Sequence, residues 1–261
     1  MSGTMKQIIG FWRRAIRRVR ASLLVAASLL PTAFSAGALE LSNAEIIQNF
    51  DVIAFRNEMR EVTNPRVSKW VRPIRVHKQF DAIIAPGSEE FLDKHLERLA
   101  RLTGVSISAV TSRNKANFII IFTRREAYLR TALAQFDPEG GGASRELRAR
   151  LKRTHCLGIY RARESNAELI RAIVIIPVDT ALKNGILKRC IVEETTQSMG
   201  LPNDSDDANP SIFNDRSPLK DLSAHDILLL KLLYHPALRV GMKRLDALRI
   251  AERILPRLRG E

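Results

Sequence analysis

The run ANFIIIF, residues 116–122, restricts the fold of this 261-residue chain more than any other feature. Its apolar core, Phe118 to Phe122, has no polar residue, and in a strand successive side chains point to opposite faces of the sheet. Both faces of such a strand must therefore be buried. The run predicts a central strand around which the other elements are arranged.

Helical and strand patterns alternate on either side of this run. Apolar spacing and capping residues predict helices at 41–59, 88–103, 125–136, 181–200, 223–235 and 240–258. Ser88 is the predicted cap of the second helix, and Ser223 with Asp226 at the N3 position predicts a capping box at 223–235. Strand patterns follow Trp70 and occupy 105–110, and two more flank the polar turn at 164–166. Because these strands look hairpin-like, we expect an α+β fold with a mixed sheet, not a doubly wound sheet.

The N-terminal residues have the layout of a secretory signal. Residues 1–20 contain six basic residues and no acid, an apolar run follows, and Ala36 and Ala38 form an A-x-A processing site. We therefore predict a signal peptide at 1–38 and a periplasmic or secreted protein. The apolar stretch 21–39 also has nearly the length of a membrane span, so an uncleaved inner-membrane anchor is the alternative. An Arg-rich transit peptide is a third interpretation.

The charge of the chain is more informative once the leader is removed. The formal net charge is +14, and subtraction of the six leader charges leaves +8. A basic chain suggests an anionic partner, but no aromatic-basic motif of a DNA- or RNA-binding protein is present. We expect no nucleic-acid partner, and we expect contact with a membrane only through the N-terminal segment.

Two cysteines bear on the compartment. In an oxidising compartment Cys156 and Cys190 are expected to pair, and closing a loop of that size contributes roughly 4 kcal/mol in the chain-entropy description. The alternative is two buried thiols that act as small apolar side chains. No Cys/His cluster predicts a structural zinc site.

The stretch IVEETTQSMGLPND, residues 191–204, carries the candidate site. At 100° per residue, Cys190, Glu193, Glu194 and Gln197 fall within one third of a helix circumference, on a face that is otherwise apolar. Burial of two carboxylates and an amide costs several kcal/mol unless each is paired or bound to a cation. These groups are therefore either paired within the fold or part of a functional site.

Written as E193-E-T-T-Q197-S-M-G200-L-P-N203-D204, this stretch resembles the metzincin zinc-peptidase helix H-E-x-x-H-x-x-G-x-x-H, with the glutamate and glycine kept and the three histidines replaced. PSIFND resembles the segment that holds the family's methionine turn, with Phe213 in the place of methionine. LSAHDILLLKLLY resembles the family's closing helix. The resemblance implies a zincin-like domain with a motif helix and a C-terminal helix.

A closer resemblance covers roughly residues 65–242. The stretch W-x-x-P-I-x-V, the cysteine before EExxQxxGLxND and the ending LY-x-P-x-L-x-x-GM are similar to a bacterial family of exported proteins and lipoproteins of unknown function. No cysteine lies near the processing site, which departs from the lipoprotein members. The expected organisation is a leader at 1–38, a helical segment at 39–64, a zincin-like domain at 65–242 and a basic C-terminal helix at 243–261.

The metzincin resemblance implies roles for four residues. Glu193, Gln197 and Asn203 take the metal-ligand positions, and Glu194 takes the position of the general base that activates a metal-bound water. Three oxygen ligands suit zinc poorly and suit calcium, magnesium or manganese better. The cofactor is therefore unknown, with a divalent metal as one option and zinc as a poor one.

Three functions are compatible with these residues. The first is an exported binding or assembly module without peptidase activity, with a protein or peptide as ligand. The second is a hydrolase in which atypical oxygen ligands or a carboxylate pair act, with Glu194 as the base. The third is a basic protein that contacts anionic envelope polymers. We favour the first, because loss of the histidine ligands removes the strongest sign of catalysis.

Overall fold

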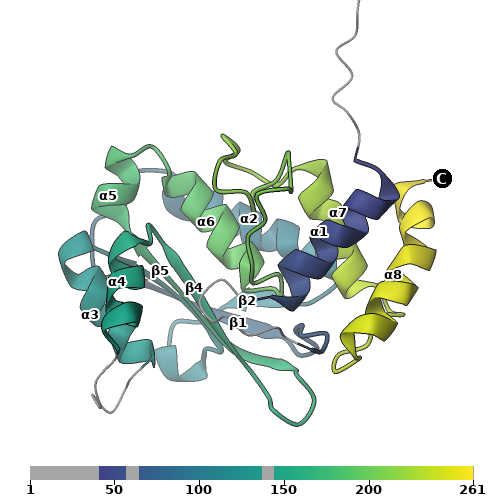
Figure 1. The fold of residues 1–261 in the computed structure, drawn as a ribbon. Helices are drawn as coiled ribbons and strands as arrows, with labels where there is room; N and C mark the ends of the chain where they lie inside the picture. Colours follow the sequence, from purple (N-terminus) through teal and green to yellow (C-terminus); the bar gives the residue numbers. More distant parts are fainter. Residues whose placement is uncertain (1–40, 57–64, 137–143, 261) are drawn as a thin grey trace, which may run out of the picture. The chain divides into compact units, whose positions relative to one another are not determined.

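The computed structural model describes residues 41–56, 65–136 and 144–260 (Figure 1). The predicted signal peptide or anchor lies outside the described residues, as does most of the predicted turn at 137–144. Leu41 onward forms one unit by residue contacts, so the first and last helices are parts of the same body as the sheet. In the described part of the chain, no helix combines the length and apolar character needed to cross a bilayer.

The apolar run forms β3 (Phe118–Thr123), the middle strand of a five-stranded sheet, as predicted, and all its residues are buried. The strand order is β2-β1-β3-β5-β4. The other strands are β1 (Ile74–Phe80), β2 (Ile107–Ala109), β4 (Leu157–Ala162) and β5 (Leu169–Pro177).

The sheet is mixed, which confirms the α+β class. The prediction of hairpin-like strands is wrong, however, for all pairs except one. β1 pairs in parallel with β2 and with β3, and β3 pairs in parallel with β5. Only β4 runs antiparallel to its neighbour β5. Parallel neighbours require crossover connections, and helices supply them here.

Helices cover both faces of the sheet. Ile119 and Ile121 of β3 face α3 (Arg125–Phe136) and α4 (Arg145–Arg153). Phe118, Ile120 and Phe122 face the larger core on the opposite side. That core includes residues of α1 (Asn43–Phe55), α2 (Ser88–Thr103), α5 (Val178–Lys183), α6 (Leu187–Gln197), α7 (Ala224–Tyr234) and α8 (Arg244–Arg259). A single turn, η1 (Arg113–Lys115), precedes β3.

Local signals explain most of the helix ends. Ser42 and Ser223 form capping boxes with Glu45 and Asp226, as the sequence predicted for α7. The predicted cap at Ser88 is wrong, because Gly87 takes the N-cap position of α2 and makes no side-chain cap.

Two helix predictions need correction. The helix predicted at 181–200 is divided into α5 and α6, because Gly185 adopts a left-handed conformation with φ of 67°. Helix α4 was not predicted. Its sequence RELRARLKR has only Leu151 as a buried residue, so its apolar pattern is weak.

The segment before β1 and the last residue of α7 hold the C-terminal end of α6 in place. Trp70 Nε1 donates to the Ser198 carbonyl at 2.9 Å, and Tyr234 Oη donates to the Met199 carbonyl at 2.7 Å. These bonds satisfy carbonyl groups that the last turn of a helix leaves without a partner. Gly200 follows with φ of 115°, and its α-carbon faces the Ser68 carbonyl so closely that no side chain fits.

We predict that Gly200→Ala lowers the free energy of unfolding by at least about 3 kcal/mol, because strain at positive φ adds to a clash with main-chain atoms. Gly104→Ala is the matched control: Gly104 has φ of 71°, but no atom lies within 4 Å of the position that an alanine methyl group would occupy, so it should lose only about 1–2 kcal/mol. Urea unfolding under oxidising conditions measures both losses of stability. Equal losses would contradict a clash between residue 200 and the Ser68 main-chain carbonyl.

Candidate functional site

Helix α6 presents its polar side chains to two different neighbours. Cys190 and Glu194, four residues apart, face β4, and Ser198 continues this row. Arg189 and Glu193, also four residues apart, face the loop after α6 at residues 201–217. The adjacent glutamates of the motif therefore belong to separate environments.

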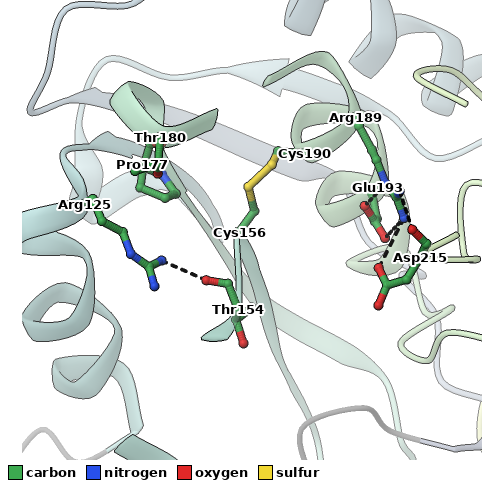
Figure 2. The surroundings of a disulfide bond; sticks show 9 residues. All are labelled: Arg125, Thr154, Cys156, Pro177, Thr180, Arg189, Cys190, Glu193 and Asp215. Atoms are coloured by element: carbon green, nitrogen blue, oxygen red, sulfur yellow. Dashed lines mark hydrogen bonds and ion pairs between the residues drawn. A yellow bond between two sulfur atoms is a disulfide. The ribbon is translucent and has the colours of Figure 1, made fainter. Parts of the chain in front are cut away.

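A disulfide joins the first row to the sheet. Cys156, directly before β4, is bonded to Cys190 of α6, with a Cα–Cα distance of 5.8 Å (Figure 2). Both residues are buried. The predicted pairing is thus confirmed, and the alternative of two free thiols is wrong. The bond fixes the start of β4 against the middle of α6.

Glu194, the predicted general base, is buried between α6 and β4. A β-carbon built on Gly158 of β4 would lie 2.9 Å from Glu194 Oε2 and 3.3 Å from Ser198 Oγ. Glycine at position 158 therefore leaves the space that the Glu194 carboxylate fills. The carboxylate is 8% exposed and packs against the strand backbone.

Glu193, a predicted metal ligand, is held by Arg189. Arg189 Nε donates to Glu193 Oε2 at 3.0 Å, and Nη2 approaches Oε1 at 3.4 Å (Figure 2). The same guanidinium donates to the main-chain carbonyls of Asn214, Asp215 and Ser217 at 3.0–3.1 Å. Arg189 thereby ties α6 to the loop that follows it.

Three carboxylates surround this guanidinium. Glu193, Asp204 and Asp215 each have an oxygen within 4.8 Å of the others. Burial acts against the charge of Arg189, but Glu193, Asp215 and Asp204 outweigh it and raise the pKa of Arg189 above its usual value. The guanidinium is thus a permanent cation at the centre of an acidic cluster.

The other two predicted ligands contact Asp204. Gln197 Nε2 donates to Asp204 Oδ1 at 2.8 Å, so Gln197 and Glu193 border the same acidic cluster. Asn203 Nδ2 donates to the Asp204 main-chain carbonyl at 2.6 Å. We define Arg189, Glu193, Gln197, Asp204 and Asp215 as the Arg189 cluster.

The donor set of the Arg189 cluster does not fit a zinc ion. Its three acidic members and Gln197 offer oxygen ligands only, whereas zinc in proteins favours imidazole and thiolate. Calcium, magnesium or manganese accept oxygen ligands, but each would have to compete with Arg189 for the carboxylates. The arrangement works chemically as an ion-pair cluster with an internal cation.

The loop after α6 is anchored by the buried carboxylate of Asp226. This carboxylate accepts from Ser211 Oγ at 2.5 Å and from the Ile212 main-chain amide at 3.0 Å, in addition to its capping role in α7. Phe213, which stands where the resemblance places a methionine, is fully buried. The PSIFND segment, residues 210–215, is therefore the anchored part of this loop, and it carries Asp215 to the Arg189 cluster.

Sequence reasoning named Glu193 and Gln197 but missed Arg189 and Asp215 as members of the cluster. The spacing of Arg189 and Glu193, i and i+4, is a detectable signal for a helical ion pair. Asp215 lies in a loop, so no periodic pattern could place it.

On its remaining side, α6 packs against α2. His95 of α2 is buried, with Nε2 3.3 Å from Thr196 Oγ1. Burial is the largest cause that lowers the pKa of His95, to about 4, with Arg98 acting in the same direction and Asp221 opposing it. The imidazole is therefore neutral at pH 7.

We predict that Arg189→Met lowers the free energy of unfolding by about 3 kcal/mol, because it leaves a largely buried carboxylate without its cation. The control is Lys188→Met, which removes the same charge from the exposed neighbouring residue and should change stability by less than about 1 kcal/mol. Chemical denaturation of the oxidised proteins measures both. A similar small change in the two variants would show that the cluster contributes little.

We also predict an acid-sensitive contribution from His95. Between pH 6.5 and about 4 the unfolded chain binds a proton at this histidine and the folded chain does not, so stability falls as the pH falls through this window. The expected slope is at most about 1.4 kcal/mol per pH unit. His95→Gln should reduce the slope, whereas substitution of the exposed His155 should leave it unchanged. Thermal unfolding from pH 4 to 7 tests this, and an unchanged slope in His95→Gln would contradict it.

Comparison with known proteins identifies the family of this chain. A family model with the description "Protein of unknown function (DUF2927)" matches residues 43–253, from the start of α1 to within α8. No curated protein matches the chain. The match spans the sheet, the disulfide and the whole Arg189 cluster. The chain therefore belongs to the DUF2927 family.

Proposed function

We propose that this protein is an exported, zincin-like binding module without peptidase activity. The observation that carries the proposal is the position of Arg189, which contacts Asp215 and also Glu193, a residue to which the resemblance assigns a metal-ligand position. A guanidinium supplies positive charge there but has no vacant coordination position for a water or a substrate carbonyl.

The zincin-like assignment is supported by the order of the elements. A strand after Trp70, helix α2, further strands, the motif helix α6, a turn and the closing helix α7 follow one another as the resemblance implies. Gly200 ends the motif helix region and turns the chain so that Asp204 returns to Gln197. Export is supported by the disulfide, since disulfides persist in oxidising compartments.

An extended peptide segment of a protein partner is the ligand class that we favour. β4 is an outer strand of the sheet and has a neighbouring strand on one side, β5. Outer strands bind extended peptides by main-chain pairing, with side-chain pockets that give specificity. The disulfide to α6 and the close packing at Gly158 hold β4 rigid, which reduces the entropy cost of binding.

We predict that the purified protein, tested with casein and a fluorogenic peptide library, shows no hydrolysis above that of Glu194→Gln. The amount of metal that remains bound to the purified protein should be far below one ion per chain. Glu97→Gln, a substitution on the exposed side of α2, is the matched control. Hydrolysis that is retained in Glu97→Gln and lost in Glu194→Gln would contradict the proposal and support the hydrolase alternative, in which the carboxylates bind an ion.

Peptide binding by main-chain pairing at β4 can be tested separately. Peptides selected from a random library on the oxidised protein should lose binding when alternate residues are N-methylated, because this removes main-chain donors. Failure to select any peptide would contradict pairing at β4. Binding that survives N-methylation of the odd-numbered residues and also survives N-methylation of the even-numbered residues would contradict it as well.

A further inference from the structure

A second region of the protein has the features of a ligand site. A cavity of about 690 Å³ lies between the segment before β1 and the start of α8, at a distance in sequence from the Arg189 cluster. Its walls are formed by Pro65, Arg66, Lys243, Arg244, Leu245, Asp246 and Arg249. We call this the α8 cavity.

The lining of the α8 cavity is strongly basic. It contains four cationic side chains and one carboxylate, that of Asp246, which pairs with Arg249 at 3.3 Å. Asp51 pairs with Arg244 from outside the lining and offsets one of these charges. The cavity therefore retains an excess of positive charge in the part of the chain that the structure describes, and it favours an anionic ligand.

Main-chain contacts bring these cations together from two distant segments. Arg66 and Lys243 form an isolated β-bridge, and the Arg244 main-chain amide donates to the Pro65 carbonyl at 2.8 Å. Arg66 Nη2 also donates to the Glu164 carbonyl at 2.8 Å, which orients its guanidinium. The positive charges are thus held by the fold and are not a property of one helix surface alone.

Helix stability does not account for these cations. Lys243 is the N-cap of α8 and makes no side-chain cap, and Arg244 is the first helical residue. Positive charge at a helix N-terminus is unfavourable because the helix dipole is positive there. By contrast, α1 and α7 begin with a serine cap, whereas α8 lacks a side-chain cap and has Asp246 as the acidic residue of its first turn. An anion in the α8 cavity would offset this unfavourable arrangement.

The cavity also has an apolar wall. Leu245 is 61% exposed, and Pro65 contributes to the lining from the segment before β1. A ligand that combines an anionic group with an apolar part would cover Leu245 and contact the cations.

We propose that the α8 cavity binds an organic phosphate that carries an apolar chain. Arginine side chains bind phosphate oxygens with paired hydrogen bonds, and Arg66 and Arg249 border the cavity on different segments. The phosphate lies among the cations, and the chain lies against Leu245 and Pro65. A free alkyl phosphate and a lipid headgroup share this chemistry.

Calorimetric titration with hexyl phosphate and with inorganic phosphate at low salt tests the proposal. The wild-type protein should bind hexyl phosphate more tightly than inorganic phosphate, because the latter leaves Leu245 uncovered. The double variant Lys243→Gln/Arg249→Gln should weaken hexyl phosphate binding at least about tenfold, since it removes charge-assisted hydrogen bonds. Leu245→Ser should weaken hexyl phosphate but not inorganic phosphate.

Arg253→Gln/Arg257→Gln is the matched control, because both residues are exposed on α8, carry the same total charge and lie outside the cavity lining. This control should change the dissociation constant less than about twofold. An equal loss in the control, or no binding of either phosphate by the wild type, would overturn the proposal. Thermal unfolding of each variant confirms that the fold is kept.

Vesicles distinguish the two sources of the phosphate. Sedimentation with vesicles of phosphatidylcholine containing phosphatidylglycerol, weakened by Lys243→Gln/Arg249→Gln and not by Arg253→Gln/Arg257→Gln, would identify a lipid headgroup. Binding of hexyl phosphate without vesicle binding would identify a free phosphate ester. Vesicle binding that both double variants weaken equally would contradict a defined site in the α8 cavity.

Discussion

The ion-pair cluster around Arg189 is the interaction on which the rest of the candidate site depends. Its guanidinium joins Glu193 of α6 to three main-chain carbonyls of the following loop and lies among three carboxylates. The Glu193 carboxylate, on a side chain that is only 12% exposed, is costly to bury without a cation, and the chain supplies the cation itself. The same residues that would otherwise be interpreted as metal ligands are therefore explained by the fold.

The row of α6 that contains Cys190, Glu194 and Ser198 has a different role. The Cys156–Cys190 bond and the contact of Glu194 with Gly158 fix the helix against β4, an outer strand of the sheet. One side of α6 thus holds the loop and the other side holds the strand (Figure 2). A rigid outer strand next to a helix that is fixed to it by a disulfide is a suitable arrangement for binding, and this connects the packing to the proposed function.

The sequence was sufficient for features that depend on local patterns. The run Phe118 to Phe122 predicted the central strand, Ser223 and Asp226 predicted a capping box, and two cysteines in a chain with a predicted signal peptide predicted the disulfide. Each of these rests on periodicity, capping chemistry or redox compartment. The family match agrees with the similarity to a family of unknown function.

Features that depend on long-range contacts were not predictable. Parallel pairing of β3 with β1 and β5 is decided by crossover helices, and the strand sequences alone do not show it. The separation of Glu193 from Glu194 depends on which neighbour lies beside each face of α6, and Asp215 reaches Arg189 from a loop. A helical-wheel projection places adjacent glutamates on one arc but cannot show that a strand and a loop divide that arc.

Anomalous diffraction from crystals soaked in manganese or zinc chloride tests the central claim most directly. If Arg189 is the resident cation of the cluster, no anomalous peak will lie within coordination distance of Glu193 and Asp204, and the guanidinium will keep its contacts with Glu193 and Asp215. A peak bound by these carboxylates, with Arg189 displaced, would contradict the assignment of Arg189 as that cation and restore the metal-dependent interpretation.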